Sequence, residues 1–192
     1  MRNLETKKAI RKQILSNRNL LTEAERRNYD FQIREKLYAM QEYQNATQVL
    51  LYLSYGTEAG TWEILEHCIQ EGKEVYCPKV LSDGIMEFFR VCSKEDIAKG
   101  YQGIMEPVTE NKFLYQEHST HLVLMIMPLT VFDKNRNRIG YGKGFYDRYL
   151  CGKTDIKTIA IAYDEQEYMG SIPTGNYDIK PNVILTQTQI FS

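Results

Sequence analysis

Hydrophobic positions in the first forty residues recur with the period of an amphipathic helix. The apolar side chains near one stripe of the first such helix are Leu4, Ile10, Ile14 and Leu15. Thr22 followed by Glu25 is a capping-box pattern, which marks the start of a helix. Residues 1–40 are therefore predicted to form two helices, the second beginning just after Thr22.

Beyond residue 45 the apolar residues come in short runs separated by turn residues, which is typical of strands. The predicted strands are residues 49–53, 74–78, 85–91, 121–128, 158–163 and 182–186. The run 121–128 is apolar almost throughout, as in a strand covered on both faces, so we expect it at the centre of the sheet. Residues 85–91 follow the turn sequence SDG and are expected to form a hairpin partner or an edge strand.

A helix is expected over residues 61–72, between the first two strands. Strand, helix and strand in a span of roughly thirty residues is a βαβ unit, which implies a parallel sheet. A further helix is expected from about Phe145, and no repeat or flexible linker divides the chain. The sequence thus predicts one domain over residues 1–192, a three-layer α/β/α domain with a mostly parallel sheet and N-terminal helices.

The net charge of −1 gives no general attraction to nucleic acid or to an acidic membrane. The charge is uneven, however, because residues 1–36 hold ten Lys or Arg and five Asp or Glu. A basic helical end of this kind is either a solvated helix face or a wall over an anionic ligand. The charge pattern alone leaves both interpretations open.

The cysteines are widely spaced and form no C-x-x-C pair: Cys68, Cys77, Cys92 and Cys151. This spacing favours four free thiols over a disulfide framework or a zinc site. The first residues lack the apolar core of a signal peptide, and the longest apolar run is too short to span a bilayer. We therefore expect a cytoplasmic monomer with no membrane partner.

The stretch NRIGYGKGFYDRYL, residues 137–150, is unlike ordinary packing sequence. Its glycines alternate with a tyrosine and a lysine, in the order Gly140, Tyr141, Gly142, Lys143 and Gly144. The stretch follows the expected central strand and precedes a helix, a place where α/β proteins bind ligands. Glycine lets the backbone approach an anion closely, and Arg138 and Lys143 add positive charge, so the stretch suits a polyphosphate.

The glycine pattern alone does not decide between a phosphate-binding loop and a tight strand-to-helix turn. The sequence G-x-x-x-x-G-K-[ST] is absent, and Phe145 stands where the dinucleotide-binding pattern has its third glycine. Support for the phosphate loop has to come from the rest of the chain.

RIGYGKGFYDRYL resembles the signature of the 5-formyltetrahydrofolate cyclo-ligase family, usually written R-L-G-x-G-x-G-[YF]-Y-D. Further segments are similar to the family in the same order along nearly the whole chain: KKAIR, YLSYGTE, GIMEP, MPLTVFD, and IPTGNYD followed by NVILT. The sequence departs from the family pattern at Leu129, where glycine is usual, at Ala59–Gly60, which replace Val-Asp, and at Tyr177, which replaces histidine. These departures concern contacts to substrate rather than the reaction.

The resemblance implies an ATP- and Mg²⁺-dependent conversion of 5-formyltetrahydrofolate to 5,10-methenyltetrahydrofolate, with release of ADP and phosphate. ATP would phosphorylate the formyl oxygen and make it a leaving group, after which N10 closes the ring. Phosphoryl transfer needs mainly positioning and charge neutralisation, which backbone N–H groups, arginine, lysine and Mg²⁺ provide.

The resemblance also implies the residues of the site. For ATP they are Lys7, Lys8, Arg11, Arg138, Ile139, Gly140, Tyr141, Gly142, Lys143, Gly144, Phe145 and Tyr146. For the folate substrate they are Glu58, Tyr141, Gly142, Lys143, Gly144 and Phe145. The catalytic residues are Lys143, Arg138 and Tyr141, and the metal ligands are Asp147 and Asp178. Without the resemblance, Lys7 and Arg11 would be interpreted as solvated charges, and Asp147 as a first-turn carboxylate favoured by the helix dipole.

Two other functions fit the predicted architecture. One is a sugar-phosphate isomerase or a CoA-transferase-like enzyme, neither of which would need ATP. The other is a catalytically silent module that binds folate or nucleotide. Nucleic-acid binding through the basic helices is disfavoured by the near-neutral charge and the lack of a recognition motif.

Overall fold

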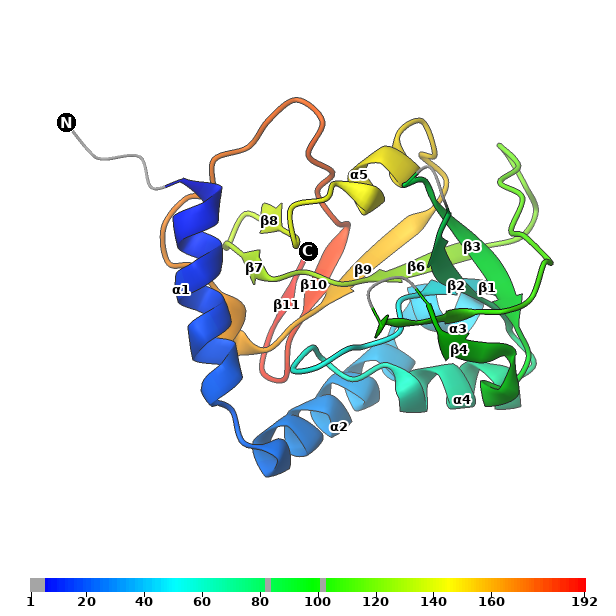
Figure 1. The fold of residues 1–192 in the computed structure, drawn as a ribbon, viewed down its shortest axis with the longest axis horizontal. Coiled ribbons are helices and arrows are strands. Elements are labelled where there is room, and N and C mark those ends of the chain that lie inside the picture. Colours follow the sequence, from blue (N-terminus) through cyan, green and yellow to red (C-terminus); the bar gives the residue numbers. More distant parts are fainter. Residues whose placement is uncertain (1–5, 82–83, 101–102) are drawn as a thin grey trace.

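A seven-stranded sheet forms the centre of the structure, a computed structural model that describes residues 6–81, 84–100 and 103–192 (Figure 1). From edge to edge the strands are β11 (Ile190–Phe191), β10 (Val183–Leu185), β9 (Lys157–Ile161), β6 (Val123–Met127), β1 (Gln48–Leu51), β2 (Glu74–Val80) and β3 (Met86–Val91). Neighbours from β10 to β2 are parallel, and the edge strands β11 and β3 are antiparallel. The predicted mostly parallel sheet is confirmed, as is the hairpin partner, although turn residues 82–83 lie outside the described ranges.

Strand β6 occupies the middle of the sheet, between β1 and β9. All five of its residues are buried, and Leu124 lies opposite Val49 of β1 and Lys157 of β9. A strand covered on both faces has no reason to alternate polar and apolar residues. The prediction of a central buried strand within residues 121–128 is confirmed.

The α-helices of the described ranges are α1 (Lys7–Leu20), α2 (Glu23–Ala39), α3 (Gln41–Asn45), α4 (Trp62–Gln70) and α5 (Phe145–Leu150). The two predicted N-terminal helices are α1 and α2, while Leu4 and the rest of residues 1–5 lie outside the described part of the chain. The capping box at the start of α2 is confirmed, because the Thr22 hydroxyl accepts from Glu25 N at 3.2 Å and the Glu25 carboxylate accepts from Thr22 N at 2.8 Å. Among the residues described, no helix combines the length and the apolar character that crossing a bilayer requires.

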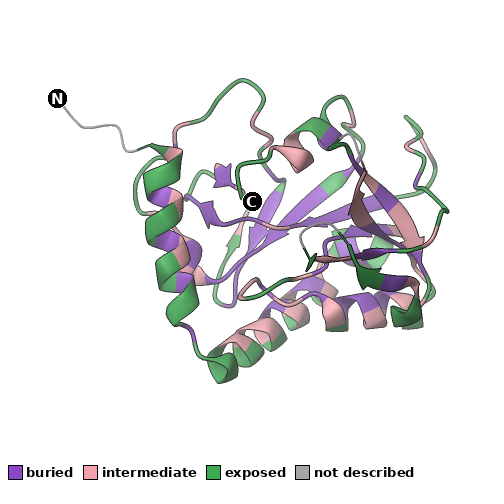
Figure 2. Ribbon diagram, in the orientation of Figure 1, coloured by how far each residue is buried: buried purple, intermediate pink, exposed green. Residues whose placement is uncertain are grey.

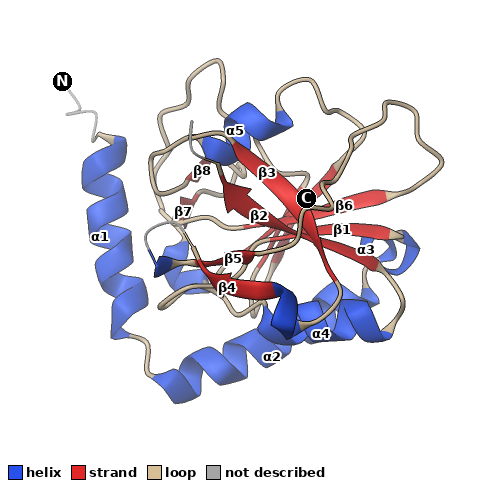
Figure 3. Ribbon diagram, turned by 45° about the vertical axis from the view of Figure 1, so that its right-hand side comes forward, coloured by secondary structure: helices blue, strands red, loops and turns tan. Residues whose placement is uncertain are grey.

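Helices α2, α3 and α4 cover one face of the sheet, and α5 lies on the other (Figure 3). Successive side chains of a strand point to opposite faces. Accordingly Val49 and Leu51 of β1 pack in one cluster with Leu37 of α2, whereas Leu50 packs in the other cluster with Tyr149 of α5. The three-layer arrangement is confirmed, although the layer on the second face consists of one short helix and connecting segments.

Two small antiparallel ribbons lie outside the main sheet. They are β4 (Ile97–Lys99) with β5 (Met105–Pro107), and β7 (Val131–Phe132) with β8 (Arg138–Ile139). Helix α1 packs on the second ribbon, and its apolar stripe contributes Ile10 and Ile14 to a separate small core with Val131, Ile139 and Ile172. The outer side of α1 is exposed (Figure 2). The first helix is therefore held by the chain segments that follow β6 rather than by the faces of the sheet.

All four cysteines are free in the structure, as predicted, and they differ in access. Cys68 and Cys77 are buried, and burial raises the pKa of the Cys68 thiol to about 11 and that of Cys77 further still. Because the thiolate is the reactive form, a thiol-specific reagent at neutral pH should modify exposed Cys92 and Cys151 quickly and the other two only after denaturation. Four fast thiols in the folded protein would contradict this assignment.

Candidate active site

The strand order reverses between β1 and β6, since the chain passes from β1 to β2 on one side and from β6 to β9 on the other. Open α/β sheets bind ligands at such a switch point, outside the carboxyl ends of the strands. The 52–61 loop leaves β1 there, and the segment after β6 leads to the glycine loop (residues 140–144). Arg18 of α1 joins the two, because its Nε donates to Thr57 Oγ1 at 3.1 Å and its Nη2 donates to the Tyr141 hydroxyl at 3.1 Å.

The glycine loop joins β8 to α5 and lies against α1. Arg11 Nε donates to the carbonyl oxygen of Gly140 at 2.7 Å. Gly142 has a φ of +96°, with Arg11 Nη2 only 3.3 Å from where a Cβ would stand, and Gly144 has a φ of +66°. L side chains rarely adopt positive φ, so glycine is required at both positions. The loop thereby brings bare backbone next to a cation from the first helix.

Lys7 extends this basic wall toward the C-terminal part of the chain. It forms an ion pair with Asp178, whose Oδ2 also accepts from Gly175 N at 2.7 Å. Burial alone would raise the pKa of Asp178, but the bonds from Lys7 and Gly175 outweigh burial and the net pKa is lowered. Lys8 and Lys143 are exposed. The basic end predicted from the sequence is thus turned in part toward the glycine loop.

Asp147 and Arg138 form a second ion pair below the glycine loop. Arg138 is buried, and its Nη2 donates to Asp147 Oδ1 at 2.6 Å. Its Nε donates to the carbonyl oxygen of Ile179 at 3.1 Å, and Ile179 N donates back to Asp147 Oδ1 at 3.0 Å. Burial lowers the pKa of Arg138, and the charge of Asp147 opposes that shift. The carboxylate predicted to bind metal therefore also neutralises a buried guanidinium.

The oxygen donors of Asp147 and Asp178 suit magnesium better than a softer metal. Magnesium prefers oxygen ligands and is usually held by one or two carboxylates together with phosphates and water. In the described residues no group of three His, Cys, Asp or Glu side chains could hold a metal by itself. A hollow of about 230 Å³ lies beside Arg138 and Asp178. The residues present fit a magnesium ion that is bound largely through a nucleotide.

Glu58 faces the glycine loop from the 52–61 loop. Its Oε2 accepts from Tyr55 N at 2.8 Å, and its carboxylate lies near the Tyr141 hydroxyl. Burial raises the pKa of Glu58, against the opposing effects of Tyr55 N, the Tyr141 hydroxyl and the charge of Arg18. Burial likewise raises the pKa of Tyr141 to about 12. Glu58, Tyr141 and Arg18 thus form one polar cluster across the switch point.

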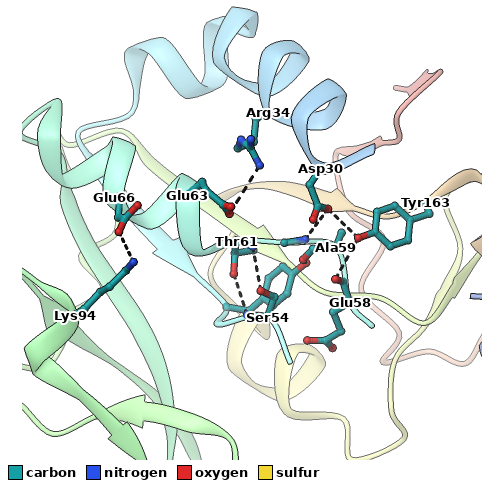
Figure 4. A network of polar contacts seen from close by, with 12 residues as sticks. Asp30, Arg34, Ser54, Glu58, Ala59, Thr61, Glu63, Glu66, Lys94 and Tyr163 are labelled. Carbon is teal, nitrogen blue, oxygen red and sulfur yellow. Dashed lines mark hydrogen bonds and ion pairs between the residues drawn. The ribbon is translucent and has the colours of Figure 1, made fainter. Parts of the chain in front are cut away.

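Asp30 of α2 holds the 52–61 loop from behind (Figure 4). Its Oδ1 accepts from Gly60 N at 2.8 Å and from the Tyr163 hydroxyl at 2.8 Å, and that hydroxyl also lies 3.3 Å from the carbonyl oxygen of Glu58. A Cβ on residue 60 would stand 2.6 Å from Asp30 Oδ2. At Gly60, where the sequence departs from the family pattern, a larger residue would therefore have to displace this carboxylate.

Replacing Gly60 by alanine should lower the free energy of unfolding by about 1–3 kcal/mol, the usual cost of overpacking a tight site. The strain comes from Asp30, so the additional Asp30→Ala change should remove it. Urea unfolding of both single variants and the double variant measures this coupling. A Gly60→Ala cost that is the same with and without the Asp30 carboxylate would contradict the explanation.

Several of the predicted site residues have side chains that pack in the core and do not project freely into the site. Ile139 is buried against α1, and Phe145 and Tyr146 pack against the sheet core. Leu129 is also buried in that core, so this departure does not face a ligand, whereas Tyr177 is 85% exposed.

The sequence-based site omitted Arg18, Asp30, Tyr163 and Thr57. Arg18 left a trace in the sequence, because it stands four and eight residues after Ile14 and Ile10 on the buried stripe of α1. A cation at a buried stripe position is a usable signal for a polar site. Asp30 and Tyr163 lie 133 residues apart, and the sequence contains no signal that they are partners.

Comparisons with known proteins agree with this geometry. Residues 3–187 match the 5-formyltetrahydrofolate cyclo-ligase family. The 5-formyltetrahydrofolate cyclo-ligase of Mus musculus is 31% identical over 93% of this chain and 92% of its own, and that of Mycoplasma pneumoniae is 30% identical over 93% and 97%. The solved structure of Aquifex aeolicus 5,10-methenyltetrahydrofolate synthetase superimposes with a TM-score of 0.81 and 29% identity, covering 96% of this chain and 91% of that one. A whole-length family match, full-length relatives and the same fold agree, and the chain belongs to the 5-formyltetrahydrofolate cyclo-ligase family.

Proposed function

We propose that the protein converts 5-formyltetrahydrofolate to 5,10-methenyltetrahydrofolate with consumption of ATP and release of ADP and phosphate. Family membership supports the reaction. The observation that carries the proposal is the meeting of two chemically different loops at the switch point: the glycine loop with Arg11 on one side, and Glu58 on the other.

The nucleotide half of the site is the glycine loop with Lys7, Arg11 and Lys143. Cations and bare backbone beside a loop of this kind neutralise and orient phosphates, which is most of what phosphoryl transfer requires. Lys8, Ile139, Phe145 and Tyr146 complete the proposed ATP-binding residues, the last three chiefly by shaping the loop. Magnesium, when bound, supplies further charge neutralisation on the phosphates, and Asp147 and Asp178 are the residues proposed to hold it.

The folate half of the site is Glu58, with Gly142, Gly144 and Phe145 of the facing segment. A pterin ring carries an amino group and a ring N–H on one edge, and a carboxylate is a matched acceptor for such a pair. Tyr141 lies between the two halves, since its hydroxyl contacts both Arg18 and Glu58. Substrate and nucleotide would therefore meet at Tyr141 and Lys143.

The proposed reaction has two stages, phosphorylation of the formyl oxygen and ring closure. The formyl oxygen bonds to the γ-phosphorus as the bond from that phosphorus to ADP breaks. N10 of the folate then bonds to the activated formyl carbon and loses its proton, and the carbon–oxygen bond breaks with release of phosphate. Arg138, Lys143 and Tyr141 are proposed to act by stabilising charge on the transferring group. None of these steps needs a nucleophilic side chain.

The test is an absorbance assay, because methenyltetrahydrofolate absorbs at longer wavelength than its precursor. We expect the band to appear with 5-formyltetrahydrofolate, ATP and Mg²⁺ together and to be absent when ATP is left out. Binding of both ligands without the band would instead favour a silent binding module. Conversion without ATP would favour an isomerase-like or transferase-like enzyme.

We further propose that the protein works as a cytoplasmic monomer on small molecules, without nucleic-acid or membrane partners. Free thiols at all four cysteines support a reducing compartment. Sedimentation of the active protein at assay concentration would reveal a dimer if one were required.

A further inference from the structure

Arg18 is buried in the last turn of α1, with 4% of its surface exposed. Its hydrogen-bonded partners, Thr57 and Tyr141, both offer hydroxyls, and its Nη1 is buried with no acceptor among the residues that the structure describes. Burying a charge is costly unless an opposite charge or several hydrogen bonds compensate for it. A simple tether between α1 and a loop would not need a full charge at this position.

Glu58 is the carboxylate on which that charge acts. Burial disfavours the charged form of Glu58, and Arg18 opposes this effect through its own charge. Besides Arg18, titratable groups that interact with Glu58 are hydroxyls, that of Tyr52 in the same loop and those of Tyr141 and Tyr146 in the segment after β8. Burial raises the pKa of each of these hydroxyls, so all three are neutral at physiological pH. The positive charge in the described surroundings of Glu58 therefore comes from Arg18.

Two hydrogen bonds of Arg18 lead toward Glu58. Its Nε donates to the hydroxyl of Thr57, the residue before Glu58, at 3.1 Å. A guanidinium has donors and no acceptor, so the Tyr141 oxygen must accept from Arg18 Nη2. The hydroxyl proton of Tyr141 is then free to be donated, and the neighbouring Glu58 carboxylate is an acceptor of the right kind for it. This relay from Arg18 to Tyr141 fixes the hydroxyl oxygen beside Glu58.

We propose that Arg18 is a positioning residue that acts through Thr57 and Tyr141 to orient Glu58 for the N–H edge of the pterin substrate. This inference rests on the proposed function of Glu58 as the pterin acceptor. It makes the end of the first helix part of the folate half of the site, although the start of the same helix belongs to the nucleotide half.

The experiment compares Arg18→Met, Arg18→Lys, Tyr141→Phe and the Arg18→Met/Tyr141→Phe double variant. Arg27→Met is the matched control, because Arg27 is an exposed arginine on α2 that pairs only within its own helix, with Glu23. The readouts are the KM values for 5-formyltetrahydrofolate and ATP, the pH profile of kcat/KM, and the calorimetric Kd for 5-formyltetrahydrofolate alone. The Kd keeps the inference testable even if the wild-type protein forms no product.

Arg18→Met should weaken 5-formyltetrahydrofolate binding about tenfold or more, as expected for hydrogen bonds to charged groups, and change the KM for ATP less than about threefold. Loss of the cation raises the pKa of Glu58 further, so the acid limb of kcat/KM should move to higher pH. Arg18→Lys keeps the charge and should restore the acid limb. The double variant should bind no worse than the weaker single variant, because both act through one relay.

Two results would overturn the inference. One is folate affinity in Arg18→Met equal to that of the wild type and the Arg27→Met control, with the acid limb unmoved. The other is an equal loss for ATP and folate that Arg18→Lys does not relieve, which would make Arg18 a plain structural anchor. A wild-type protein that binds folate with this Arg18 dependence but makes no methenyl product would remove the proposed reaction and leave the positioning role standing.

Discussion

Replacing Asp147 by asparagine should reduce turnover at least about tenfold and raise the magnesium concentration needed for half-maximal rate, because even indirect partners of a metal cost about 10–100-fold when changed. Asparagine keeps the shape of the side chain but gives up the negative charge. The measurement is a magnesium titration of the initial rate at saturating ATP and folate. Asp155→Asn is a suitable control, since that half-exposed carboxylate pairs with His118 away from the glycine loop.

The ion pair between Asp147 and Arg138 adds a second effect to this variant. Removing one partner of a buried pair typically costs about 3–5 kcal/mol, because the other charge stays buried and unpaired. The melting temperature should therefore fall as well, and rates have to be compared at a temperature where both proteins are folded. An unchanged magnesium requirement with a lowered melting temperature would show that Asp147 serves only Arg138.

Replacing Glu58 by glutamine should raise the KM for 5-formyltetrahydrofolate by about 10–100-fold, the range for a lost charged hydrogen bond, and leave the KM for ATP within about threefold. The glutamine amide turns a donor toward the N–H groups of the pterin, where the carboxylate offers an acceptor. Separate titrations of the two ligands measure the difference.

Glu63→Gln is the matched control for Glu58→Gln. Glu63 is an exposed carboxylate at the start of α4 that lies 3.8 Å from Arg34, outside the polar cluster around Glu58 (Figure 4). The Glu63→Gln variant should leave the KM values for folate and for ATP near those of the wild type. Equal losses for folate and ATP in Glu58→Gln would show that the assignment of Glu58 to the pterin is wrong.

Elements with strong local signals could be predicted from the sequence. The buried run of β6 and the capping box of α2 each reflect a pattern that the chain carries within a few residues. The ends of the elements carry weaker signals. The predicted strand spans residues 49–53, whereas β1 ends at Leu51. Tyr52 and Leu53 are buried although they lie beyond the end of β1. In a sequence, buried apolar residues that follow a strand cannot be distinguished from residues of the strand itself.

The predicted strands do not include the two-residue strands β7 and β8, and the predicted helices do not include α3. Elements this short owe their existence to tertiary contacts, because local propensity over two to five residues is too weak to decide. β7 and β8 form where α1 packs on them. The role of Asp30 has no sequence signal for the same reason, since its partners Gly60 and Tyr163 lie far away in the sequence.

The glycine loop could be located from the sequence, but its surroundings could not. Positive φ at Gly142 and Gly144 explains why glycine is needed there. The contact of Arg138 with the Ile179 carbonyl oxygen and the pairing of Lys7 with Asp178 depend on how residues 174–180 return to the site. No spacing rule predicts that return.

The packing of α1 on segments made much later has a consequence for synthesis of the chain. Arg11 contacts Gly140, 129 residues further on, and Lys7 meets Asp178 after 171 residues. At ribosomal rates of about 5–20 residues per second, the first of these partners emerges roughly 6–26 s after Arg11. A single 14-residue helix is marginal in water by itself. Helix α1 is therefore translated well before the segments on which it packs, and the nucleotide half of the site can close only after the segment around Asp178 has emerged.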